Sequence, residues 1–197
     1  MFSYYAIYKP FGTLSQFTKE GEHQTLAELG FNFPKDVYPV GRLDADSEGL
    51  LLLTNDKRIN SRLLDPEQGH ERSYLVQVEG DISAEAMNRL QEGIEISFDG
   101  KIYKTRSASI EKLVDLPVIP ERNPPIRFRL NVPTSWIRLK IIEGKNRQVR
   151  KMTAKVGFPT LRLIRESINE LSLNTMESGR VEVMERSEFY SKLGLRF

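Results

Sequence analysis

The stretch that decides the fold is Gly49-Leu50-Leu51-Leu52-Leu53-Thr54-Asn55-Asp56. Its four consecutive leucines are too few for a typical helix, and glycine on one side and a turn-forming Asn-Asp pair on the other limit the run. A continuous apolar run of strand length indicates a strand that is buried on both faces. The sequence therefore predicts a sheet with this strand in its interior.

The segments on either side carry further signals. We expect strands at residues 3–8, 37–40, 74–78, 136–143 and 161–164, and helices at 25–29, 59–64, 83–92 and 146–156, the last two capped by Ser83 and Asn146. Ile137, Leu139 and Ile141 alternate with Arg138 and Lys140, which predicts that the strand at 136–143 is half-buried. Asp99-Gly100 predicts a tight hairpin, and residues 117–133, which hold five of the ten prolines, predict an extended loop. Strands dominate and hairpins join neighbours, which favours an α+β fold with a mostly antiparallel sheet.

Composition excludes several classes of protein. The 197 residues are 39% hydrophobic and 28% charged, which is typical of one globular core or of one domain split into two lobes. The absence of cysteine excludes disulfides and cysteine-based zinc sites, and His23 and His70 are too far apart for a histidine metal site. No signal peptide or membrane span is recognisable. We expect a soluble, cytoplasmic monomer.

Positive charge is concentrated in one part of the chain. Residues 138–165 hold nine basic residues and one acidic residue, a local charge of +8 in a chain whose total is +2. At helical spacing Arg147, Arg150 and Lys151 share one face. Such a surface is typical of a protein that binds a polyanion, and the alternative is a solvated helix face that binds nothing.

The loop Gly41-Arg42-Leu43-Asp44-Ala45-Asp46-Ser47-Glu48-Gly49 precedes the buried strand. Asp44, Asp46 and Gly49 match three positions of a calcium loop, but Asn55 replaces its final glutamate and a strand replaces its second helix. The loop can also be a polar turn. A third interpretation makes one carboxylate a nucleophile or base, kept ionised by a cation that residues 138–165 could supply.

Five segments, in order, resemble the motifs of the RsuA family of RNA pseudouridine synthases. They are Tyr8-Lys9-Pro10, the loop at 41–51, Arg72-Ser73-Tyr74-Leu75-Val76, Glu143-Gly144-Lys145-Asn146-Arg147-Gln148-Val149-Arg150-Lys151-Met152 and Leu161-Arg162-Leu163-Ile164-Arg165. The resemblance runs from about residue 4 to 168. Ser47 stands where many relatives have threonine, and Lys145 where arginine is common. Residues 122–127 and 133–136 look most like a member that acts on large-subunit ribosomal RNA.

The resemblance implies a mixed sheet with flanking helices, in two lobes around a central active-site cleft. It implies one catalytic domain over residues 1–197, without the N-terminal S4-type RNA-binding domain of many relatives. Asp44 aligns with the catalytic aspartate, which acts on the ribose of a uridine so that the base is released and rejoins through C5. Tyr74 aligns with the tyrosine that stacks on the base, although a strand tyrosine can also be an ordinary core residue. Arg150 aligns with the basic partner of the aspartate.

The implied substrate is ribosomal RNA, with large-subunit rRNA favoured, and the reaction needs no cofactor and no metal. A stacked uridine cannot present C1′ and C5 to a protein, so the base must be flipped out or unpaired. The residues expected to bind the RNA are Arg42, Lys145, Asn146, Arg147, Lys151, Leu163 and Arg165. The alternative is a non-catalytic RNA-binding or ribosome-assembly factor that keeps the fold.

Overall fold

The structure is a computed structural model that describes residues 1–126 and 132–196. The chain divides into two compact units, of which unit 1 comprises Met1–His70 with Ile164–Phe197 and unit 2 comprises Glu71–Leu163. Residues 114–126 form no helix or strand, as the predicted extended loop requires, and the part of that prediction at 127–131 lies outside the described residues. Each unit is described by itself below.

Unit 1 is built around the predicted buried strand. Its elements in chain order are β1 (Tyr4–Lys9), the 3-10 helix η1 (Leu26–Glu28), β2 (Tyr38–Pro39), β3 (Glu48–Thr54), α1 (Arg58–Leu64), the 3-10 helix η2 (Pro66–Gln68), the later part of β9 (Thr160–Ile168), β10 (Leu171–Ser172), β11 (Val181–Met184) and α4 (Arg186–Lys192). The strands follow the order β11-β1-β3-β9. Every residue of β3 is buried, which confirms the burial predicted from its four leucines.

The pairing of β3 with β9 is parallel and depends on a glycine. Gly49 pairs with Arg165 and has a φ of +106°, a conformation that side chains rarely adopt. A Cβ atom at Gly49 would lie 2.4 Å from the carbonyl oxygen of Arg165. Only glycine therefore allows the two backbones to approach this closely at the start of β3.

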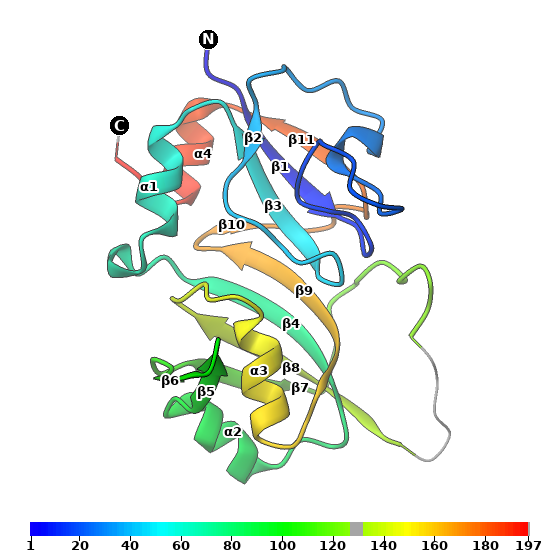
Figure 1. Ribbon diagram of the computed structural model, residues 1–197, viewed down its shortest axis with the longest axis vertical. Helices are drawn as coiled ribbons and strands as arrows, with labels where there is room; N and C mark the ends of the chain where they lie inside the picture. The colour runs from blue at the N-terminus through cyan, green and yellow to red at the C-terminus, as the bar shows by residue number, and fades with distance from the viewer. Residues whose placement is uncertain (127–131, 197) are drawn as a thin grey trace. The chain divides into compact units, whose positions relative to one another are not determined.

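Unit 2 also combines helices and strands. Its elements in chain order are β4 (Arg72–Glu79), α2 (Ala84–Gln91), β5 (Glu95–Phe98), β6 (Lys101–Lys104), β7 (Ser109–Leu113), β8 (Thr134–Ile141), α3 (Gln148–Lys155) and the first residues of β9. The strands β4, β8 and β7 are adjacent and antiparallel. Figure 1 shows α2, α3 and the β5–β6 hairpin in front of β4 and β8. Their apolar side chains share one core cluster with the sheet.

Several local predictions in unit 2 are confirmed. Ser83 accepts a hydrogen bond from the backbone of Ala86 and caps α2 as expected. Asp99 and Gly100 both have positive φ and form the tight turn between β5 and β6. In β8 the residues alternate between buried and half-buried, as the predicted half-buried strand requires.

The predicted start of α3 is wrong. The helix begins at Gln148, and Arg147, with a φ of 51°, occupies the N-cap position instead of Asn146. Oε1 of Gln148 accepts the backbone N–H of Lys145 at 3.1 Å. The side chain that satisfies the backbone at the helix entry therefore comes from the first turn, and Asn146 is left exposed.

Within the described residues, all but one of the strand pairings given above are antiparallel, so the prediction of a mostly antiparallel α+β fold is confirmed. No helix in the described part of the chain is long and apolar enough to cross a bilayer.

Candidate active site

The loop that carries Asp44 is fixed by hydrogen bonds on both sides of this residue. Before it, the buried hydroxyl of Ser15 donates to the carbonyl of Leu43 at 2.7 Å and accepts the Leu43 N–H at 3.0 Å. After it, the Gly12 N–H donates to the carbonyl of Ala45 at 2.7 Å. Leu43 also packs into the apolar cluster of unit 1. Asp44 is half-buried, and hydrogen bonds hold the backbone of its loop in place on both sides.

Lys9, at the end of β1, is a buried cation in the same unit. Its side chain has no exposed surface, and its ammonium group donates to the carbonyl oxygens of Pro10 at 2.9 Å and Thr13 at 2.7 Å. These bonds join the end of β1 to the turn that follows it. The same turn donates the Gly12 N–H to the loop of Asp44, so Lys9 stabilises that loop indirectly, through the turn.

The electrostatic surroundings of Lys9 connect it to the loop. Burial lowers the pKa of Lys9 to about 7, because the charged form loses its hydration. The carboxylates of Glu48, Asp46 and Asp44 oppose this decrease in the pKa, and Arg165 adds to it. Lys9, from the N-terminal motif, is thus in electrostatic contact with Asp44.

Arg165 is the one basic residue of the segment 138–165 that lies in unit 1. It is 5% exposed, and its Nε donates to the carbonyl oxygen of Leu50 at 2.7 Å. Its Nη2 is buried and has no hydrogen-bond partner among the described residues. Arg42, the other unit 1 residue expected to bind RNA, is exposed.

Tyr74 and Leu163 lie in the core cluster of unit 2. Tyr74 is 7% exposed and pairs across the strands with Leu139, and Leu163 is 5% exposed. Both residues therefore have the burial of core residues, which for Tyr74 is the alternative that the sequence left open. Their neighbour Arg72 is also buried, and its guanidinium donates to the carbonyl oxygen of Ile142 at 3.4 Å.

The basic segment of unit 2 presents its charges around the start of α3. Lys145, Asn146 and Arg147 are exposed, while Arg150 and Lys151 are half-buried. Nη1 of Arg150 lies 3.5 Å from the carbonyl oxygen of Thr160, which begins β9. The opposite face of α3 is buried; it consists of Val149, Met152, Thr153 and Val156.

The predicted site residues thus divide between the units. Unit 1 holds Arg42, Asp44 and Arg165, and the charges of the last two both act on Lys9. Unit 2 holds the remaining seven; these are Tyr74, Lys145, Asn146, Arg147, Arg150, Lys151 and Leu163.

Sequence reasoning missed the roles of Lys9 and of Glu143, whose carboxylate accepts hydrogen bonds from the Arg106 N–H at 3.1 Å and from Nε2 of Gln148 at 2.6 Å. The available signal for Lys9 was a lysine that ends an aromatic strand directly before a proline. For Glu143 it was the single acidic residue in a segment with nine basic ones. In each case the side chain is buried, so its charge had to be satisfied inside the protein.

The calcium-loop interpretation finds no support. Among residues 1–126 and 132–196, no group of three acidic or histidine side chains is arranged to hold a metal ion. Glu48 is 2% exposed within β3, where it faces the protein interior.

Comparisons with known proteins agree with the sequence motifs. The family described as "RNA pseudouridylate synthase" matches residues 3–155. Ribosomal large subunit pseudouridine synthase E of Vibrio parahaemolyticus is 47% identical over 173 residues, which cover 87% of this chain and 69% of that protein. The protein of the same name from Xanthomonas axonopodis pv. citri is 47% identical over 170 residues, covering 85% and 86%. Ribosomal large subunit pseudouridine synthase B of Bacillus subtilis is 32% identical, covering 89% and 65%.

A solved structure described as "Crystal structure of pseudouridylate synthase" has a TM-score of 0.78 and 26% identity to this chain, covering 98% of it and 74% of the other. This likeness confirms the predicted fold class. The family match extends over the loop of Asp44, Tyr74 and the basic start of α3. The chain therefore belongs to the RNA pseudouridylate synthase family.

Proposed function

We propose that this protein converts a uridine of ribosomal RNA into pseudouridine, and that the RNA is that of the large subunit. Support comes from the family match over residues 3–155 and from relatives named ribosomal large subunit pseudouridine synthase E at 47% identity. Within the chain, the supporting observation is Asp44, which is held by backbone hydrogen bonds on either side and lies in electrostatic contact with the buried cation Lys9.

The reaction is an isomerisation in which atoms balance without a co-reactant. The N1–C1′ bond of the uridine breaks and a C5–C1′ bond forms, while C5 loses a proton and N1 gains one. Asp44 promotes the first step as an ionised carboxylate, either by adding to C1′ or by removing the C2′ proton. A carboxylate whose loop is already fixed needs little reorganisation when the ribose arrives.

Both units contribute residues in this proposal. Tyr74 offers a phenol to the base and to the C5 proton, and Leu163 offers an apolar contact. We assign Arg150 to the reaction through its resemblance to the family's basic partner of the catalytic aspartate, because a guanidinium stays charged and can pair with a carboxylate. The RNA is bound by the cations around the start of α3, which are Lys145, Arg147 and Lys151, together with Asn146, Arg42 and Arg165. We further propose that the protein acts as a monomer in the cytoplasm.

Asp44→Asn tests the proposal. Purified protein is incubated with large-subunit ribosomal RNA, and pseudouridine is mapped by a carbodiimide mark that stops reverse transcription. The wild type should produce one new mark, and Asp44→Asn should lower its rate by at least about 10³-fold, as expected for the loss of a nucleophile or base. The matched control is Asp46→Asn, which makes the same charge change in the same loop and should retain activity within about tenfold.

Cells that lack the protein extend the test to the natural substrate. Their ribosomal RNA should lack one mark, which the wild type restores and Asp44→Asn does not. If Asp44→Asn restores the mark, Asp44 is not the reacting group. If the wild type binds ribosomal RNA but adds no mark in either assay, the protein is the non-catalytic RNA-binding factor that the sequence left as the alternative.

A further inference from the structure

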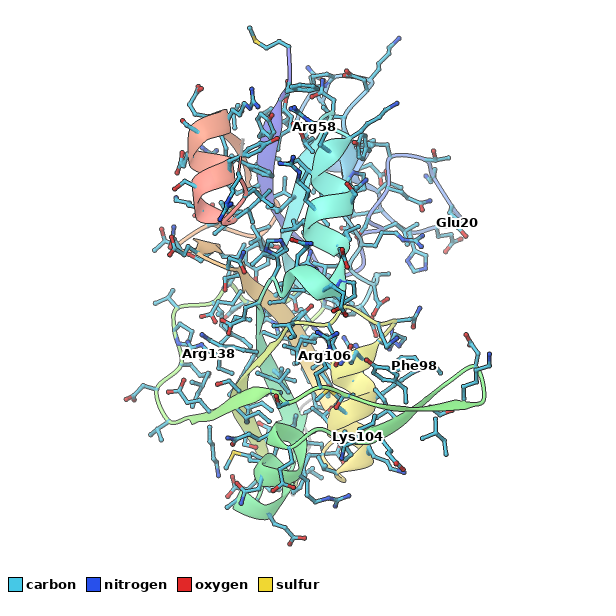
Figure 2. The ribbon with its side chains drawn as sticks, turned by 90° about the vertical axis from the view of Figure 1, so that its left-hand side faces the viewer. Glu20, Arg58, Phe98, Lys104, Arg106 and Arg138 are labelled. Atoms are coloured by element: carbon cyan, nitrogen blue, oxygen red, sulfur yellow. The ribbon has the colours of Figure 1, made fainter. Side chains whose placement is uncertain are left out.

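The β5–β6 hairpin of unit 2 places two aromatic rings on one face. Because Ile96 pairs with Tyr103 and Phe98 pairs with Lys101, these four side chains point to the same side of the hairpin. Ile96 is buried on that side and belongs to the core cluster that includes residues of α3. Figure 2 shows Phe98 beside α3. The hairpin therefore presents the rings to the helix that begins with the basic motif.

Two lysines of that motif lie over the rings. The ammonium nitrogen of Lys145 is 4.0 Å from the centre of the Tyr103 ring and 5.8 Å from that of Phe98. The ammonium nitrogen of Lys151 is 4.0 Å from the centre of the Phe98 ring and donates to the carbonyl oxygen of Ser97 at 2.8 Å. These distances fall well within the range of cation–π attraction. The two rings are themselves edge to face, with centres 6.0 Å apart.

A buried carboxylate anchors this arrangement. Glu143 is 3% exposed and accepts hydrogen bonds from three groups: the hydroxyl of Tyr103, the backbone N–H of Arg106 at 3.1 Å and Nε2 of Gln148 at 2.6 Å. One acceptor thus ties the end of the hairpin to the first residue of α3. The hydrogen bond to Glu143 also raises the pKa of Tyr103, because ionisation of the phenol would place two negative charges together.

We propose that Phe98 and Tyr103 are positioning residues that hold Lys145 and Lys151 as a preformed pair of phosphate contacts for single-stranded RNA. Phe98, Tyr103, Lys145 and Lys151 are called the lysine–aromatic cluster below. A free lysine side chain loses much conformational freedom when it binds a phosphate. Here the Tyr103 ring already restricts Lys145, and the Phe98 ring and the Ser97 carbonyl already restrict Lys151. An ammonium group has three N–H donors, so Lys151 can still offer one to a phosphate oxygen.

The charges around the cluster favour an RNA strand as the ligand. Three further exposed basic residues lie on the hairpin, directly after it or at the start of α3; they are Lys101, Arg106 and Arg147. The hairpin also has two exposed acidic residues, Glu95 and Asp99. Lys145 and Lys151 add two more cations, so the surface carries a net positive charge. The inference rests on the proposed function for the identity of the polyanion, and it assigns to the hairpin a part in binding that no single motif of the sequence indicated.

The test uses a single-stranded, fluorescein-labelled oligouridylate of about 20 nucleotides, because phosphate contacts of this kind do not depend on sequence. Its affinity is measured by anisotropy over a series of salt concentrations. Lys145→Ala and Lys151→Ala should each reduce the slope of log K against log salt by about 0.7, as expected for one lost phosphate contact to a single strand. Phe98→Leu should raise Kd about threefold and leave the slope nearly unchanged, since the lysine charges remain.

Conservative variants separate positioning from packing. Leucine at position 98 keeps an apolar side chain but removes the ring, whereas Phe98→Tyr keeps the ring and should restore the wild-type Kd. Ile102→Ala is the control on the opposite face of the same hairpin, where the side chain is 76% exposed. Lys112→Ala is the control for the loss of a lysine elsewhere in unit 2, where Lys112 pairs with Asp81. Both controls should bind as the wild type does.

Two results would overturn the inference. Slopes for Lys145→Ala and Lys151→Ala equal to that of Ile102→Ala would show that the lysines contact no phosphate. A Phe98→Leu protein that binds as tightly as the wild type, while Lys151→Ala binds weakly, would show that the Phe98 ring does not position Lys151. The assay is independent of catalysis, so a wild-type protein that binds the oligouridylate but forms no pseudouridine in rRNA refutes the proposed function and leaves this inference standing.

Discussion

Two buried charges of unit 1, Asp56 and Lys9, are stabilised in different ways. Asp56 accepts hydrogen bonds from the phenols of Tyr4 at 3.1 Å and Tyr190 at 2.7 Å and from two guanidinium nitrogens of Arg58 at 2.8 Å each. These donors hold the pKa of Asp56 well below its usual range, and they outweigh the opposing effect of burial. Lys9 donates to the backbone carbonyls of Pro10 and Thr13, and the effect of burial on its pKa exceeds that of its acidic neighbours.

Asp56 therefore carries a charge that stabilises the fold, whereas the protonation state of Lys9 changes near neutral pH. Asp56 connects β1, α1 and α4 through side chains, and the rings of Phe189 and Tyr190 pack against Tyr4 nearby. Lys9 lies in electrostatic contact with Asp44, and its pKa of about 7 is close to neutral pH. Asp56 is therefore a structural centre, whereas Lys9, whose charged form is disfavoured by burial, lies in the surroundings of the proposed catalytic group.

Removing the charge of Asp56 should have the largest effect. Asp56→Asn leaves an amide nitrogen where the carboxylate accepted hydrogen bonds, so buried phenols lose partners, and the free energy of unfolding should fall by about 3 kcal/mol. Urea denaturation measures this loss. Asp36→Asn, an exposed aspartate of the same unit, is the matched control and should change stability by less than about 0.5 kcal/mol.

The same variant tests the pH dependence. Because the folded-state pKa of Asp56 is depressed, its stabilisation is present above the unfolded-state pKa of about 4 and is lost as the pH falls toward the folded-state value. The wild type should therefore lose stability relative to Asp56→Asn as the pH falls below about 4. Parallel pH profiles for the two proteins would contradict the assignment of a strongly stabilised carboxylate.

The hydroxyl of Ser15 is the next test, because it fixes the residue before Asp44. Ser15→Ala leaves the buried N–H and carbonyl of Leu43 without this partner and should cost about 2 kcal/mol of stability. Pseudouridine formation at saturating RNA should slow by about tenfold, because the carboxylate is no longer held in place. Ser61→Ala, which removes an exposed hydroxyl in α1, is the control. Equal activity in both variants would mean that the loop needs no such support.

Replacing Lys9 should change how the stability of the protein depends on pH. Its folded-state pKa of about 7 lies below the usual 10.5, so the folded protein binds fewer protons than the unfolded chain between these values. Stability from this group therefore rises with pH across that range, by at most about 1.4 kcal/mol per pH unit. Relative to Lys9→Met, the wild type should gain stability between pH 7 and 9 in urea denaturation. A constant difference would place the ammonium group outside the low-dielectric interior.

The features that sequence predicted are those with local causes. The four leucines of β3, the alternation in β8, the Ser83 cap and the Asp99-Gly100 turn depend on neighbouring residues, and each was confirmed. The features that it missed depend on contacts between distant residues. The cap of α3 failed because the Gln148 side chain reaches back to Lys145, and the function of Glu143 depends on Tyr103, 40 positions earlier.

The candidate site follows the same division. Asp44 and the basic segment could be identified because the motifs that resemble the family are short and contiguous. The buried state of Lys9 could not be predicted, since a lysine before a proline has the same local sequence whether it faces solvent or the interior. The ring contacts of Lys145 and Lys151 likewise depend on how the hairpin packs against α3.

The smallest expected effect concerns Arg147, the N-cap residue of α3, which has a φ of 51°, where a side chain raises the energy of the backbone. Arg147→Gly and Arg147→Ala remove the same charge, but only glycine relieves this strain. Both variants should weaken oligouridylate binding equally, with a decrease of about 0.7 in the salt slope. The glycine variant should be more stable than the alanine variant by about 1 kcal/mol in urea denaturation. Equal stability of the two variants would show that the αL conformation at this residue carries no cost, whereas unequal binding would show that the backbone, and not the guanidinium alone, shapes the RNA contact.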